Sequence, residues 1–242
     1  MSQPGTEKNR EYRSLVEDRK ACKLCASQLA NPYRIDGGAL DSERIGPYSQ
    51  WQGNLAAPLL VVGQDFSDMK GFRQCRGWAS DISTNRTLRD LVACAGLEIS
   101  MPEYGAPEDR AFFTNAVLCI KTGNQKGRRQ NVPMWCFHNC SSFLRRTIEV
   151  VNPTVVVTLG VKALKTVRAA FPGGDRRPLR EIVGNCIPLI PGVMLAPMYH
   201  PSPQVVNRYR SFAEMCEDWE GLRPLLPPAP NNRLHRSRSA RR

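Results

Sequence analysis

Two short polar loops carry residue types that together can catalyse hydrolysis. Residues 63–65 read Gly-Gln-Asp and residues 200–203 read His-Pro-Ser-Pro. Each loop follows an apolar run typical of a buried parallel strand, and open α/β sheets bind their ligands where such strands end. A carboxylate and an imidazole that face each other can activate water and stabilise a developing anion. We therefore expect Asp65 and His200 to face one pocket of an enzyme.

The strands that must position these loops are predicted by four apolar, β-branched or aromatic runs, at residues 59–62, 112–118, 154–159 and 193–198. Segments with helical spacing lie near residues 85–97, 137–151, 161–171 and 209–225. Alternation of strands and helices is typical of a parallel sheet with helices on both faces. The predicted fold is a three-layer α/β/α arrangement with a central, mainly parallel, four-stranded sheet.

The 242 residues predict one domain with short extensions. We expect a polar arm or first helix over residues 1–20, a single α/β domain over 21–226, and a Pro-rich, then basic and disordered tail over 227–242. No apolar run approaches the roughly 20 residues of a membrane span, and residues 1–20 lack the apolar stretch of a secretory signal. These features predict a cytoplasmic protein without a membrane partner, and we expect it to be a monomer.

The chain is strongly basic, with 34 Lys and Arg residues against 22 Asp and Glu residues and a formal net charge of +12. The five arginines from Arg233 onward account for part of this excess, and the remainder lies in the body of the chain. A basic excess favours a polyanionic partner, most simply nucleic acid bound through its phosphates.

Five of the nine cysteines have spacings that suit a metal site: Cys22 and Cys25, then Cys119, then Cys136 and Cys140. Four thiolates from this set could bind Zn²⁺ or an iron–sulfur cluster, and the spacing alone does not choose between them. All nine could also be unliganded thiols. In a reducing compartment we expect no disulfide framework, and helical patterns around Cys94 and Cys216 indicate small core residues there.

The ordered set of motifs resembles the uracil-DNA glycosylase superfamily, particularly its iron–sulfur members. The resemblance runs from about Cys22 to Leu225. Its elements are a Cys-x-x-Cys pair, a strand ending in a catalytic loop, a second strand ending at Thr114-Asn115, Cys119, a helix-borne cysteine, and the His-Pro-Ser loop. It implies a monofunctional enzyme that hydrolyses the N-glycosidic bond of a flipped uracil in DNA and leaves an abasic site. No lysine occupies an obvious nucleophile position, so we expect no strand cleavage through a Schiff base.

The resemblance also implies roles for individual residues. Asp65 would orient the attacking water, His200 would donate a hydrogen bond to uracil O2, and Asn115 would recognise O4 and N3–H of the base. The expected stacking aromatic is Trp78, with Phe72 as a weaker candidate. The remaining expected contacts are Gln64 and Phe66 on the base, and Ser202, Gln204 and Arg208 on the DNA, where Gln204, Val205 or Arg208 would be the wedge that enters the base stack.

The first loop departs from the iron–sulfur members, which usually read Gly-Glu-Ala-Pro-Gly. The Gly-Gln-Asp of this chain instead looks like the most active branch of the superfamily, in which a tyrosine two positions after the aspartate excludes thymine. Ser67 stands at that position and is too small for this role. Exclusion of thymine would then depend on Phe66.

The implied cofactor is a [4Fe-4S] cluster held by Cys22, Cys25, Cys119 and Cys140, with a structural role. Two alternatives exist for the fourth ligand. Cys140 matches the family's register to the following Phe143-Leu144 pair, whereas Cys136 better matches the usual gap after the third ligand. We prefer Cys140, because a loop absorbs extra residues more readily than helix packing does.

Simpler roles remain open for each residue. Asp65 could be a helix N-cap, His200 a hydrogen-bonded structural residue, Asn115 a turn residue, and Trp78 a core aromatic. Three other functions are also compatible with the sequence: a non-catalytic nucleic-acid-binding relative, a glycosylase for another deaminated base, and a zinc-stabilised protein acting on another base or nucleotide.

Overall fold

A five-stranded sheet lies at the centre of the computed structural model, which describes residues 4–46, 54–66, 69–70, 83–99, 110–123 and 131–228. The strand order is β3 (Ala111–Asn115), β2 (Leu59–Gly63), β5 (Val155–Leu159), β7 (Val193–Met198) and β6 (Ile187–Ile190). The first four strands are parallel, and β6 runs antiparallel to β7. The α/β class and the mainly parallel sheet are therefore confirmed.

The predicted count of four strands was wrong by one, because the edge strand β6 was missed. Pro188 interrupts its short apolar run, and most of its residues are only half-buried. A proline within a strand is tolerated at the edge of a sheet, where its missing N–H is not needed by a neighbour. The predicted strand over residues 112–118 also ends earlier, at Asn115.

The sheet is buried on both faces. On β2, Leu60 and Val62 pack into one apolar cluster, whereas Leu59 and Val61 pack into another on the opposite face. This division follows from the alternation of side chains along a strand. A strand buried on both faces needs a continuous apolar sequence, which is why these runs were recognisable.

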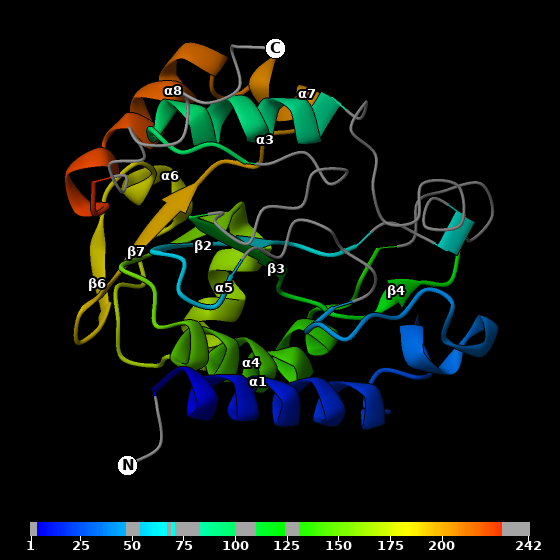
Figure 1. Cartoon of the computed structure of the whole chain (residues 1–242). Helices are drawn as coiled ribbons and strands as arrows, with labels where there is room; N and C mark the ends of the chain where they lie inside the picture. Colours follow the sequence, from blue (N-terminus) through cyan, green and yellow to red (C-terminus); the bar gives the residue numbers. More distant parts are fainter. Residues whose placement is uncertain are drawn as a thin grey trace, which may run out of the picture.

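Helices cover both faces and complete the three layers (Figure 1). On one face lie α4 (Met134–Val151) and α5 (Val161–Ala170), with α1 (Pro4–Ala21) packed on α4. On the other face lie α3 (Ser83–Cys94) and α8 (Phe212–Glu220). Single turns are formed by α6 (Leu179–Ile182) and α7 (Pro203–Val206). No described helix combines the length and the apolar character that crossing a membrane requires.

The first helix is tied to the loop that follows it. The Arg19 side chain is buried, forms an ion pair with Asp41, and donates to the carbonyls of Ser42 and Arg44. The α1 helix also contributes the fully buried Leu15 to the core. The domain boundaries at residues 20 and 226 stay predictions.

A short antiparallel ribbon lies outside the main sheet and consists of β1 (Leu29–Ala30) and β4 (Ile120–Lys121). The buried Asn31 fixes it to the end of α1, because its amide nitrogen donates to the carbonyls of Arg19, Lys20 and Cys22. The ribbon therefore joins the Cys22–Cys25 turn to the segment that follows β3.

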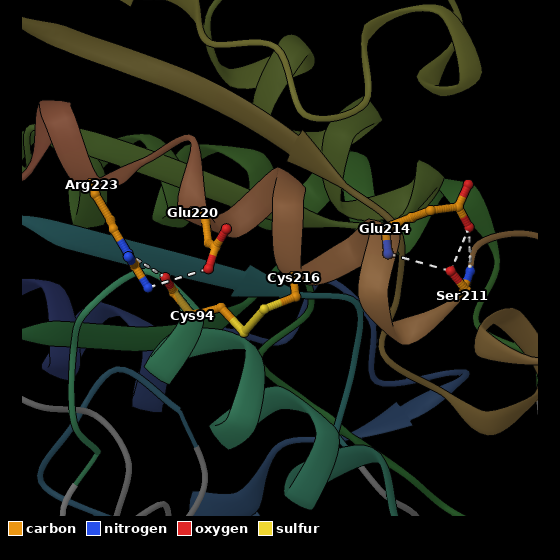
Figure 2. Close-up of a disulfide and its surroundings, with 6 residues drawn as sticks. All are labelled: Cys94, Ser211, Glu214, Cys216, Glu220 and Arg223. Atoms are coloured by element: carbon orange, nitrogen blue, oxygen red, sulfur yellow. Dashed lines mark hydrogen bonds and ion pairs between the residues drawn. A yellow bond between two sulfur atoms is a disulfide. The ribbon is translucent and has the colours of Figure 1, made fainter.

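A disulfide between Cys94 and Cys216 links the end of α3 to α8 (Figure 2). The expectation that these two cysteines are separate core residues was wrong, because the packing of α3 on α8 brings their sulfur atoms together. The same junction is reinforced by Arg223, whose Nε donates to the Cys94 carbonyl at 2.7 Å. Both helices lie over one face of the sheet, so the disulfide links the two helices of that layer covalently.

Candidate active site

The predicted polar residues gather at the carboxyl edge of the parallel strands. Asp65 lies two residues beyond the end of β2, Asn115 ends β3, and His200 follows β7 by two residues. The backbone joins the first two segments, since the amide of Val117 donates to the carbonyl of Gln64 at 3.2 Å. The strand register thus brings together side chains that are far apart in the chain.

Asp65 and His200 interact electrostatically. Burial lowers the pKa of His200 from its ordinary value of 6.5, and the negative charge of Asp65 opposes this shift. A nearby carboxylate favours the charged form of an imidazole, whereas burial favours the neutral form. Burial is the larger effect here, so the imidazole is favoured in its neutral form.

The Asp65 carboxylate is held at both oxygens. The Lys121 ammonium contacts Oδ1 at 2.5 Å, and the Gln64 amide nitrogen donates to Oδ2 at 2.6 Å. Gln64 was predicted at this site, whereas Lys121 was missed. Its position is set by the β1–β4 ribbon, and no spacing motif relates it to residue 65.

Asn115 occupies the space that a side chain at position 63 would need. A Cβ built on Gly63 would lie 2.0 Å from the Asn115 Oδ1 atom. The two residues are register partners on adjacent parallel strands. Glycine at position 63 therefore allows the carboxamide to lie across the end of β2, beside the Gln64-Asp65 loop.

The Phe66 ring packs against the loop that Arg19 anchors. A Cβ added to Gly46 would come within 2.8 Å of the ring, so the absence of a side chain there admits the phenyl group. Phe66 is half-buried and also touches the small apolar cluster around Leu40 and Ile120. The end of the loop at Phe66 is thus supported by the N-terminal region.

The His200 loop leads directly to the exposed helix α7. Gly160 lies beside it, since a Cβ at that position would be 3.5 Å from the His200 Cβ. Ser202 precedes α7 and does not cap it with its hydroxyl, whereas Gln204 and Arg208 are exposed. The three predicted DNA contacts therefore follow His200 within eight residues of the chain, with side chains at or near the surface.

Part of the predicted site lies outside the described residues. This applies to Trp78, Phe72 and Ser67. A cavity of about 610 Å³ lies elsewhere, between α1 and α4, and is lined by Arg10, Glu11, Ser14, Arg146, Glu149 and Val150. None of these residues comes from the carboxyl edge of the sheet, so this cavity is not part of the candidate site.

The five cysteines singled out by their spacing lie close together. A hydrogen bond with Cys140 lowers the pKa of Cys25 to about 6, helped by hydrogen bonds with Asn139 and Cys136 and opposed by burial. Burial raises the pKa of Cys119 to about 12, and the charges of Cys25, Cys22 and Cys136 add to this effect. Both Cys136 and Cys140 thus reach Cys25, and all five are free thiols.

This gathering fits an iron–sulfur cluster in its chemistry, because such clusters are ligated by cysteine thiolates. The thiols are not arranged as a closed cage: within the described part of the chain, no three His, Cys, Asp or Glu side chains form a group that could hold a metal ion. The choice between Cys136 and Cys140 stays a prediction.

Comparison of the sequence with known proteins identifies its family. A model described as the uracil DNA glycosylase superfamily matches residues 50–223. The chain is 30% identical over 181 residues to a type-5 uracil-DNA glycosylase of Pyrobaculum aerophilum, covering 69% of this chain and 71% of the relative. It is 29% identical over 220 residues to a type-4 uracil-DNA glycosylase of Thermotoga maritima, covering 89% of this chain and 95% of the relative. The chain belongs to the uracil DNA glycosylase superfamily.

Proposed function

We propose that this protein removes uracil from DNA by hydrolysing its N-glycosidic bond, which leaves an abasic site. The observation that carries the proposal is the placement of Asp65, Asn115 and His200 at the carboxyl ends of three parallel strands of one sheet. Family membership supports it, as do relatives whose names state the same activity.

The reaction breaks the bond between C1′ of the sugar and N1 of uracil, and forms a bond from a water oxygen to C1′. Positive charge develops on the sugar, and the electron pair of the broken bond leaves with the base. Asp65 orients the water, offsets the positive sugar and accepts the proton that the water loses. His200 donates a hydrogen bond to O2 of the departing uracil anion.

The neutral form of His200 suits this role. Its lowered pKa leaves one ring nitrogen as a donor at neutral pH. The donor is preorganised by the Pro-framed loop, so little rearrangement is needed as charge develops on the base.

Recognition of the base is assigned to the residues around β2 and β3. The Asn115 carboxamide offers a donor and an acceptor to N3–H and O4 of uracil. Gln64, beside Asp65 in the same loop, is proposed to contact the base, and Phe66 is proposed to form an apolar wall of the pocket. Trp78 is proposed as the residue that stacks on the base. We infer that Phe66, rather than the small Ser67, limits access for thymine.

The DNA strand is assigned to the surface beside His200. Ser202 is proposed to hold a phosphate, and Gln204 and Arg208 are proposed to contact the distorted duplex near the flipped nucleotide. Extrusion of a base costs roughly a few kcal/mol, which phosphate contacts and a wedge can offset. The basic character of the chain supports this assignment, since phosphate neutralisation supplies much of the affinity for DNA.

A [4Fe-4S] cluster is proposed to bind Cys22, Cys25, Cys119 and Cys140. The cluster would cross-link the turn after α1, the segment after β3 and the start of α4. Five neighbouring free thiols support this proposal. We also propose a cytoplasmic location, and we propose that the protein is a monomer.

The test is release of free uracil from an oligonucleotide with a single uracil. Wild-type protein should release the base, and Asp65→Asn and His200→Ala should each lose most of the activity while still binding DNA. Salt-sensitive binding without release of any base would favour the non-catalytic relative. Oligonucleotides with thymine mismatches, hypoxanthine and xanthine would identify a preference for another base.

A further inference from the structure

Lys121 forms a close ion pair with the catalytic carboxylate. Its Nζ lies 2.5 Å from Asp65 Oδ1, and the two side chains are only 19% and 9% exposed. Exposed ion pairs contribute little to stability or geometry, because water screens them and the side chains move freely. A charge-assisted hydrogen bond with this little exposure is stronger and more directional.

Lys121 is carried by a different element from the strand and loop that carry Asp65. Lys121 lies on β4 and pairs with Leu29 on β1. Its neighbour Ile120 is fully buried, and the Leu29 amide donates to the Cys25 carbonyl at 2.8 Å. The ammonium therefore approaches the carboxylate from a separate, anchored ribbon rather than from the loop that carries Asp65.

The two contacts on Asp65 leave room for water. An ionised carboxylate has about four acceptor positions. Within the described part of the chain, Lys121 uses one on Oδ1 and Gln64 uses one on Oδ2, which leaves a lone pair on each oxygen. Because both oxygens are held, rotation of the carboxylate about its bond to Cβ is restricted.

We propose that Lys121 is a positioning residue, which holds the Asp65 carboxylate in the orientation that directs the attacking water at C1′. This inference rests on the proposed uracil-excising function. Lys121 acts through Asp65 and does not touch the base or the sugar. Orientation of the water is a demanding requirement, since a displacement of about 1 Å from a productive geometry can cost on the order of 100-fold in rate.

The test is a double-mutant cycle, measured as single-turnover uracil release with enzyme in excess. Lys121→Met should lower the maximal rate by about 10- to 100-fold and leave the half-saturating concentration nearly unchanged. Lys121→Arg should retain more of the maximal rate than Lys121→Met, and the rate of Lys121→Gln should lie between those of the Arg and Met variants. In an Asp65→Asn background, Lys121→Met should cost almost nothing more, because the group that it positions is already lost.

The matched control is Lys8→Met, which removes the same charge from a half-buried lysine bound to the carbonyls of Leu55 and Val151. Its uracil release should equal that of the wild type. Thermal unfolding of each variant separates lost folding from lost positioning. If the Met variant does not fold, the Arg and Gln variants carry the comparison.

Two results would overturn the inference while the proposed function stands. One is a Lys121→Met protein that releases uracil at the wild-type rate. The other is a loss of rate from Lys121→Met that is as large in the Asp65→Asn background as in the wild-type background, because Lys121 would then act independently of the carboxylate. An inactive wild-type protein would instead refute the proposed function, and this inference with it.

Discussion

The Asp65 carboxylate acts on the His200 imidazole across the carboxyl edge of the sheet, although the two residues are far apart in the chain. Burial lowers the pKa of His200, and the Asp65 charge only partly restores it. Burial thus favours the neutral form of the imidazole, in which one ring nitrogen is a hydrogen-bond donor.

The buried imidazole should make folding stability depend on pH. Between the lowered pKa of folded His200 and the ordinary value of 6.5, the unfolded chain binds a proton that the folded chain does not. The free energy of unfolding should therefore fall as the pH falls through 6.5 towards the folded pKa. Measured by urea unfolding across this pH range, the free energy of unfolding should depend less on pH in His200→Gln than in the wild type. The exposed His138→Gln variant is the control and should behave as the wild type, and equal pH dependence in all three proteins would contradict the prediction.

A methyl group at position 63 should displace the recognition amide. In Gly63→Ala the added Cβ would meet Asn115 Oδ1 at 2.0 Å, and the carboxamide, which is the mobile end of its side chain, should move away. We expect kcat/KM for uracil to fall by about 100-fold with little change in melting temperature. Gly174→Ala is the matched control, because nothing lies within 4 Å of a Cβ there. In an Asn115→Ala background the Gly63 substitution should have little further effect; a large one would show that it acts through another group.

The fourth cysteine ligand can be identified by paired substitutions. Cys140→Ser should lose the iron and the visible absorption of the purified protein, whereas Cys136→Ser should retain both. The reason is the register of Cys140 to the apolar residues that follow it on α4, although both thiols reach Cys25. Iron analysis and absorption spectra of the two variants decide the question. Loss of iron only in Cys136→Ser would reverse the assignment, and stoichiometric zinc in the wild type would replace the proposed cluster.

The disulfide between α3 and α8 should stabilise the fold without affecting the reaction. Replacing Cys94 and Cys216 together by serine should lower the free energy of unfolding by about 2–5 kcal/mol, because the link spans a sequence separation of 122 residues and restricts the unfolded chain. Denaturant unfolding measures this loss, and uracil release by the double variant should be unchanged. Cys186→Ser, a free thiol packed against the same core cluster, is the control. Labelling the denatured protein should find two fewer thiols before reduction than after it, and equal counts would contradict the disulfide.

Much of the fold and of the candidate site was predictable from the sequence. Continuous apolar runs predict strands buried on both faces, and parallel strands end at a common edge. The gathering of Asp65, Asn115 and His200 follows from these two facts, because each residue stands at or just beyond the end of such a run. The edge strand β6 was missed, since a half-buried strand containing proline lacks that signal.

Other features were decided by tertiary packing. Lys121 reaches Asp65 because a two-residue ribbon pairs with a segment near the N-terminus, and such a short pairing has no sequence period. Cys94 meets Cys216 because α3 packs on α8. Local sequence determines whether a segment is buried and in which secondary structure, whereas the meeting of two distant side chains depends on how the elements pack and on the path of the loops between them.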